Sequence, residues 1–116
     1  MDRKSLESVL ALVDLLESGW QPGDSELEAA SYLETWAVVP SYEGAPFLII
    51  GIAWSLPVER EFINAPLLGF DSVSRWARTW DKWVVLGNRI QEWPDFDPTG
   101  VQRASAKWLL EELRLL

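Results

Sequence analysis

The first part of the chain has a hydrophobic pattern of helical period. Apolar residues recur there at spacings of three and four: Leu6, Val9, Leu10, Val13 and Leu16. This spacing is typical of an amphipathic helix, and Gly19 is a residue at which such a helix ends. The pattern therefore predicts a helix over residues 4–18.

A second helical pattern follows the turn at Pro22-Gly23. Ser25 and Glu28 have the spacing of a capping box, in which two side chains cap the free N–H groups of a new helix. Acidic residues in the same turn favour the positive end of a helix dipole. We expect a second helix over residues 25–35.

The middle of the chain changes to a composition typical of β-strands. Residues 36–39 and 47–54 are rich in aliphatic or aromatic residues, residues 59–63 fit a third and more exposed strand, and turns containing proline separate the three segments. Because both connections are too short for a crossover helix, the sequence predicts a three-stranded antiparallel meander. Gly51 inside the central strand indicates a bulge or a close backbone approach.

Helical spacing returns after residue 70. Three tryptophans are spaced i, i+4, i+7: Trp76, Trp80 and Trp83. Three basic residues fall on the opposite face: Arg75, Arg78 and Lys82. This pattern predicts an amphipathic helix over residues 72–86, capped by Asp71 or Ser72.

Asp97 followed by Pro98 predicts a last helix, with Asp97 as the cap and proline at the first helical position. The predicted fold is therefore α+β, a single domain over residues 1–116 with the order α-α-β-β-β-α-α. In it, helices pack on a small antiparallel three-stranded sheet.

Charge is distributed unevenly along this sequence. The formal net charge is -8, residues 1–70 hold 11 acidic and three basic residues, and residues 71–116 hold seven of each. No lysine or arginine lies between Lys4 and Arg60. Such a negative segment repels nucleic acid and anionic membranes and attracts a basic partner. We predict binding to a basic protein surface, with no direct contact to nucleic acid or membrane.

The absence of two residue types excludes several kinds of catalytic and metal-binding site. The chain has no cysteine and no histidine, which removes thiolate catalysis, disulfides, the usual general base near neutral pH and the commonest metal ligand. We therefore predict a cytoplasmic protein that is not an enzyme and has no cofactor or metal.

Eight tryptophans are an unusual number for 116 residues. Core filling is the first interpretation, since one tryptophan buries about 200 Å². Tryptophan is also enriched at the energetic centres of protein interfaces. We expect most of the eight in the core and one or two on the surface.

One cluster of carboxylates is a candidate metal site. Glu92, Asp95 and Asp97 offer oxygen ligands of the kind that Mg²⁺ and Ca²⁺ prefer. Asp97 is also explained as a helix cap, and Asp95 beside a proline is common in loops. The capping and loop interpretations are favoured, because hard cations normally need more oxygens than these.

The basic residues after position 71 raise the question of nucleic-acid binding. Nucleic-acid-binding domains usually have a net basic surface, whereas this chain has a pI near 4.4. We therefore interpret Arg75, Arg78 and Lys82 as the solvated face of a helix, or as the polar part of a protein interface.

A motif in the same region resembles a known family. Trp76-Ala77-Arg78-Thr79 is followed after six residues by Leu86-Gly87, and the segment 64–71 precedes it. This pattern is similar to the core of an uncharacterised family of small bacterial and phage proteins, in which S-P-L-x-x-L-D leads into W-A-R-T and then L-G. The resemblance covers residues 25–87, and the chain departs from it at Ala65 and Gly69. It implies one coherent domain and a bacterial or mobile-element source, and it transfers no active site.

The leading functional hypothesis is an acidic protein-binding module. One concrete form is a phage or mobile-element inhibitor of the anti-CRISPR type, which masks a basic nucleic-acid-binding surface of its target. The predicted contacts are seven carboxylates: Glu7, Asp14, Glu17, Asp24, Glu26, Glu28 and Glu34. A structural protein that forms an oligomer through tryptophan- and leucine-rich surfaces is one alternative. A carboxylate-metal enzyme built on Glu92, Asp95 and Asp97 is the other.

Overall fold

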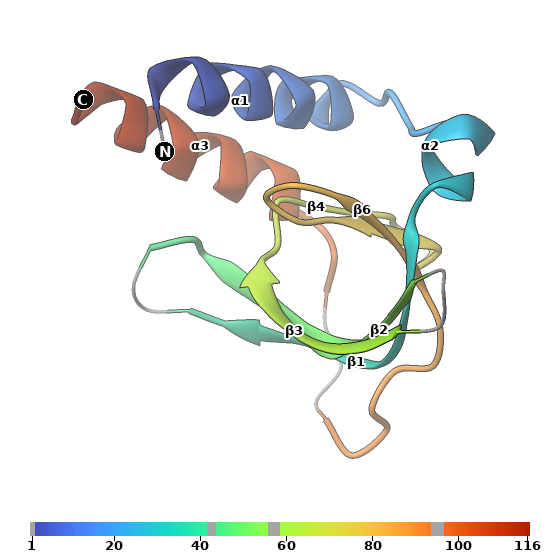
Figure 1. Cartoon of the computed structure of the whole chain (residues 1–116). Helices are drawn as coiled ribbons and strands as arrows, with labels where there is room; N and C mark the ends of the chain where they lie inside the picture. The colour runs from blue at the N-terminus through green and yellow to red at the C-terminus, as the bar shows by residue number, and fades with distance from the viewer. Residues whose placement is uncertain (1, 42–43, 56–58, 94–96) are drawn as a thin grey trace.

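The structure is a computed structural model that describes residues 2–41, 44–55, 59–93 and 97–116. Its elements in chain order are α1 (Arg3–Glu17), α2 (Asp24–Glu28), β1 (Ser31–Pro40), β2 (Phe47–Ser55), β3 (Glu59–Pro66), β4 (Gly69–Phe70), β5 (Trp76–Arg78), β6 (Trp83–Leu86) and α3 (Val101–Arg114) (Figure 1).

All six of these strands belong to one mixed sheet with the order β3-β2-β1-β6-β5-β4. The pair β1–β6 is parallel, and the other described pairs are antiparallel. Two antiparallel groups, β1–β2–β3 and β4–β5–β6, are thus joined edge to edge through β1 and β6. No helix in the described part of the chain is long and apolar enough to cross a membrane.

The predicted fold, with its three-stranded sheet and order α-α-β-β-β-α-α, is wrong. The meander of β1, β2 and β3 does form, but it is half of a six-stranded sheet, and the predicted helix over residues 72–86 does not exist. That segment instead has the two-residue alternation of strands: Val84 and Leu86 are buried, while Trp83 and Val85, which precede them in turn, are half-exposed. The backbone N–H and C=O groups of this segment form hydrogen bonds between paired strands, and not within a helix.

The second predicted helix, over residues 25–35, is wrong in length. The helix α2 covers five residues, and β1 begins at Ser31. The capping box is also displaced, because the carboxylate of Glu26 accepts from the backbone N–H of Gly23 at 2.8 Å. Neither Ser25 nor Glu28 fills the role that the sequence predicted for it.

The close approach predicted at Gly51 is confirmed. A Cβ atom there would lie 2.9 Å from the side chain of Leu33, so only glycine fits without a shift. The bulge itself lies on the neighbouring strand, where Thr35 and Trp36 together face the single residue Gly51. Thr35 has a φ of 53°, a left-handed conformation in which a β-branched residue is strained.

The first helix matches its prediction, and the last one matches in part. Asp2 caps α1 by accepting from the N–H of Ser5 at 2.7 Å. Asp97 does not cap α3, which begins at Val101 after Gly100. A left-handed φ of 86° makes glycine suitable at that position.

Two apolar clusters hold these elements together. The larger one lies on one face of the sheet and includes Leu33, Ile49, Leu67 and Val101. The smaller one lies between the helices and is formed by Leu6, Val13, Leu68, Leu109 and Leu113. In Figure 1, α1 and α3 lie side by side with both chain termini at the same end. The end of α1, the turn between β4 and β5, and the start of α3 are thereby brought together.

Candidate functional site

The seven predicted contact carboxylates are spread over three elements rather than gathered at one point. Three lie on α1, three on α2 and one on β1, in a continuous part of the chain (Figure 1). Two of those on α1 form ion pairs: Glu7 with Arg3 at 3.8 Å, and Glu17 with Arg103 of α3 at 3.2 Å. Both pairs are exposed to solvent, so each contributes little to stability.

Two further carboxylates have local structural roles. Glu26 caps α2, and its bonds to backbone N–H groups and to Ser25 lower its pKa. Glu34 accepts from the N–H of Asn88 at 2.9 Å. A hydrogen bond from Tyr32, followed by that backbone bond, lowers the pKa of Glu34. These two groups are therefore tied to the fold before any partner binds.

Within the described residues, no hydrogen bond or ion pair is found for the side-chain carboxylates of Asp14, Asp24 and Glu28. Trp20 lies in the connection between α1 and α2 and is 38% exposed. We name Asp14, Trp20, Asp24 and Glu28 the acidic docking surface. Fewer carboxylates are therefore available to a partner than the seven that the sequence predicted.

A cavity of about 240 Å³ lies where α1 ends, β4 meets β5, and α3 begins. Its lining includes Trp20 and Gln21 from the connection after α1, Asp71 and Trp76 from the β4–β5 region, and Gln102 from α3. No sequence motif marks this site, because its residues come from three distant segments of the chain.

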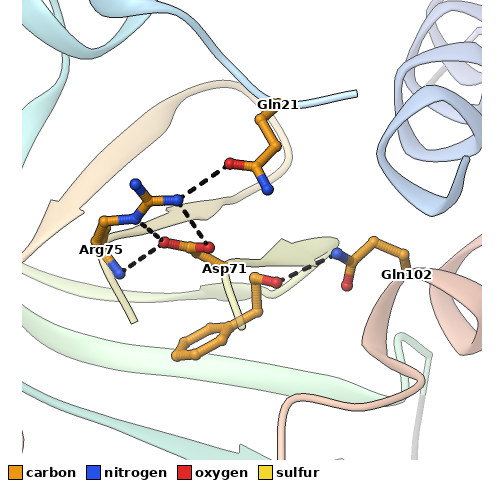
Figure 2. Close-up of polar contacts among 5 residues, drawn as sticks. Gln21, Asp71, Arg75 and Gln102 are labelled. Carbon is orange, nitrogen blue, oxygen red and sulfur yellow. Dashed lines mark hydrogen bonds and ion pairs between the residues drawn. The ribbon is translucent and has the colours of Figure 1, made fainter. Parts of the chain in front are cut away.

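The most deeply buried carboxylate of the described residues belongs to this cavity. Asp71 is 2% exposed, and the Nε of Arg75 donates to its Oδ2 at 2.7 Å (Figure 2). The backbone N–H of Arg75 donates to the same oxygen at 3.1 Å. Burial raises the pKa of Asp71, but the bonds to Arg75 and its charge outweigh burial and leave the pKa below its usual value. The carboxylate is therefore ionised and held near neutral pH, which is unsuited to proton transfer.

Arg75 extends this network to the other side of the cavity. Its Nη2 donates to the side-chain oxygen of Gln21 at 3.1 Å (Figure 2). From α3, the Nε2 of Gln102 donates to the carbonyl of Phe70 at 3.2 Å. The predicted helix is wrong for Arg75, but its side chain is exposed as predicted, and it links a buried acid to the α1–α2 connection.

Arg78 has a different environment. Its guanidinium lies 5.1 Å from the ring centre of Trp83, and burial lowers its pKa despite the nearby charge of Asp81. Trp83 in turn packs edge-on against Trp76 and touches Trp20 at 6.2 Å between ring centres. This aromatic group supports the outer wall of the cavity.

The expectation that most tryptophans are in the core is wrong. Two of them are buried: Trp36 and Trp76. Three are half-buried and three are exposed, and the exposed ones are Trp20, Trp54 and Trp93. A six-stranded sheet partly covered by three helices leaves more aromatic surface in contact with water than a helix-wrapped core would.

The candidate metal ligands are not brought into a site by the described residues. Asp97 accepts from the N–H of Thr99 at 2.9 Å, and this bond lowers its pKa. Glu92 is exposed, and Asp95 lies outside the described residues. Within those residues, no group of three metal-ligating carboxylates is present.

The motif that carries the family resemblance forms the β5–β6 hairpin and not a helix. Ala77 faces the core, and the buried hydroxyl of Thr79 lies 3.2 Å from the carbonyl of Lys82 in the turn. Leu86 is buried, and the carbonyl of Gly87 accepts from the indole N–H of Trp36 at 2.9 Å. These residues are explained by structural roles.

Comparisons with known proteins add no relative. No protein-family model, no curated protein and no solved structure matches the chain. The resemblance to an uncharacterised bacterial and phage family stays a prediction.

Proposed function

We propose that the chain is a non-enzymatic protein-binding module whose acidic docking surface binds a basic surface of a partner protein. The observation that carries this proposal is that exposed Trp20 lies, along the chain, between unpaired carboxylates of α1 and α2. Exposed tryptophans are frequent anchors of interfaces, and surrounding charges guide the approach of an oppositely charged partner.

A finer form of the proposal concerns the type of partner. Carboxylates carried on consecutive elements of a chain with net charge -8 suit a surface that otherwise binds phosphate groups. The module would then act in the cytoplasm as an inhibitor from a phage or mobile element, and it would compete with nucleic acid for its target. Competition by added DNA or RNA is the measurement that distinguishes this form from binding elsewhere on the partner.

The test begins with a partner captured at low salt and then purified. We expect its affinity for the chain to fall steeply between low and physiological salt. The variant Asp24→Lys/Glu28→Lys should weaken binding by about tenfold or more. A matched control, Glu92→Lys/Glu111→Lys, changes the net charge equally at exposed positions outside the acidic docking surface.

Trp20→Ala should weaken binding with little change in its salt dependence, because it removes an anchor and not a charge. If the control variant weakened binding as much as the docking-surface variant, net charge alone would explain the interaction. Affinity that did not change with salt would also contradict the proposal.

A second function, self-assembly, is favoured by a different observation. Strand β3 is an edge of the sheet, and its Phe62 is 69% exposed. Phe62 is paired with Ile52 of β2. Two residues along the same strands, Arg60 is paired with Trp54, and its guanidinium carbon lies 5.0 Å from the centre of the Trp54 ring. An edge strand with an exposed apolar side chain favours pairing with a second strand, although the charges of Arg60 and Glu61 oppose it. Two copies related by a two-fold axis at Phe62 would pair antiparallel and bring both Phe62 side chains together.

Because the chain has no cysteine, this second function has a clean test. Phe62→Cys should form a disulfide-linked dimer under mild oxidation, whereas Val73→Cys, which is also exposed but lies away from β3, should not. Sedimentation of the natural chain should show a dimer whose fraction rises with concentration. A monomer at every concentration, together with equal cross-linking of both variants, would exclude assembly through β3.

A further inference from the structure

The charges around the cavity between α1, β4 and α3 are internally compensated. The two carboxylates of its lining are Asp71, which is bonded to Arg75, and Glu17, which is paired with Arg103. No lysine or arginine is among the described lining residues. The negative end of α1 and the positive end of α3 both meet the cavity, so their dipoles oppose each other. The cavity therefore suits an uncharged ligand.

Two side-chain amides in the lining have orientations that their partners fix. Arginine can only donate, so Gln21 must direct its oxygen to Arg75 and its NH₂ group elsewhere. The carbonyl of Phe70 can only accept, so Gln102 must donate its NH₂ group there and keep its oxygen free. Among the five residues drawn in Figure 2, neither the Gln21 nitrogen nor the Gln102 oxygen has a hydrogen bond.

The lining of the cavity thus contains one amide donor and one amide acceptor, carried by two segments that are far apart in the chain. Both Gln21 and Gln102 line it, together with the rings of Trp20 and Trp76. Its volume of about 240 Å³ is below the range of about 300–1,000 Å³ typical of sites for drug-sized ligands, which favours a small group. Flat aromatic walls favour a planar ligand.

We propose that this cavity binds a planar, uncharged primary carboxamide. The ligand's carbonyl oxygen accepts from the Gln21 NH₂ group, and its own NH₂ group donates to the Gln102 oxygen. Its plane packs against Trp20 or Trp76. Such a group occurs in small aromatic amides and in the side chains of asparagine and glutamine in peptides. The inference goes beyond the acidic docking surface and does not depend on a basic partner.

Nicotinamide is a suitable first probe, because it places a primary carboxamide on a planar ring. Titration into the ¹⁵N-labelled chain should shift the side-chain amide signals of Gln21 and Gln102 and the indole signal of Trp20. Nicotinic acid has the same ring but a charged carboxylate without an N–H donor, and it should bind at least about tenfold more weakly. N-acetylglutamine amide tests a non-aromatic carboxamide of the peptide type.

The decisive variant is Gln21→Glu. A glutamate keeps an oxygen for Arg75, so the network and the fold are retained, but it removes the NH₂ donor. We expect the affinity for nicotinamide to fall by about tenfold or more. Gln91→Glu makes the same chemical change at an exposed site outside the cavity and should leave the affinity unchanged.

The probes also distinguish the two sources of the ligand. Binding of nicotinamide alone supports the proposal with a small aromatic amide, and binding of both amides supports it with a side chain of a peptide. If neither amide shifted the signals of Gln21 and Gln102, or if Gln21→Glu and the natural chain bound nicotinamide equally, the proposal would be overturned.

Discussion

Gly87 is a residue at which no side chain can be added without a shift. A Cβ atom there would lie 2.6 Å from a carboxylate oxygen of Glu34 and would collide with the Tyr32 hydroxyl. The N–H of Gly87 also donates to the Leu33 carbonyl at 2.8 Å, which limits backbone movement. We expect Gly87→Ala to lower the free energy of unfolding by up to about 1 kcal/mol, less than the usual cost of overpacking a core, because Tyr32 is exposed and the colliding side-chain ends can move.

Urea denaturation measures this change, and a double variant supplies its control. Because Tyr32→Ala removes both the hydroxyl and the ring carbon that would collide with the new Cβ, Gly87→Ala should cost less in that background. An equal cost in both backgrounds would show that the collision with Tyr32 is not the cause.

Asp71 should make stability depend on acid pH. Its pKa is lowered in the folded state, so its contribution is fully present above the unfolded value of 3.8 and is lost as the pH falls through the folded pKa. At pH 7, Asp71→Asn should lower the free energy of unfolding by about 1.5–3 kcal/mol, because it weakens hydrogen bonds to a charged group. Denaturation from pH 7 to pH 3 should show the gap between the two proteins narrowing below pH 4. A constant gap would assign the stabilisation to something other than the ionised carboxylate.

At the scale of elements, the bulge of β1 holds a strained residue. Thr35 is exposed and has a left-handed φ of 53°, which asparagine adopts far more readily than a β-branched residue. We expect Thr35→Asn to raise the free energy of unfolding by about 1 kcal/mol. The variant Thr99→Asn, at an exposed residue without a positive φ, should not give this gain. Loss of stability on Thr35→Asn in urea denaturation would contradict a strained bulge.

The elements also show which parts of the fold were predictable from the sequence. The helix α1 has a long apolar stripe that can be recognised without knowledge of its partner, and β2 is rich in residues that favour strands. In β5 and β6, strands of three and four residues are too short for a periodic signal. The spacing of the tryptophans in this segment is also typical of a helix. Which side chains are buried depends instead on the pairing of β6 with β1 and of β5 with β4.

The candidate cavity was not predictable for a related reason. Asp71 and Arg75 are four residues apart, which is the spacing of an ion pair on a helix. In the structure, the same spacing belongs to the turn between β4 and β5. Gln21 is 54 residues from Arg75, and Gln102 is 32 residues from Phe70. Only the tertiary packing of α1 and α3 around the β4–β5 turn brings these groups to one place.

At the scale of the whole molecule, the first and last parts of the chain depend on each other. Strand β1 is completed by the parallel strand β6, and α1 packs on α3 through Leu6, Val13, Leu109 and Leu113. Val101 at the start of α3 is fully buried in the cluster on the sheet. Separate folding of the acidic half would leave an unpaired edge on β1 and an exposed apolar stripe on α1.

A chain shortened to residues 1–100 should therefore be unfolded. It loses three buried side chains of α3, Val101, Leu109 and Leu113, each of which contributes about 1.5–3 kcal/mol on burial. Their sum is comparable to the total stability of a small domain, which is about 5–15 kcal/mol. The complete chain should unfold in one transition, with far-UV circular dichroism and tryptophan fluorescence changing at the same urea concentration. Two separate transitions, or a native spectrum in the shortened chain, would mean that the sheet is stable without α3.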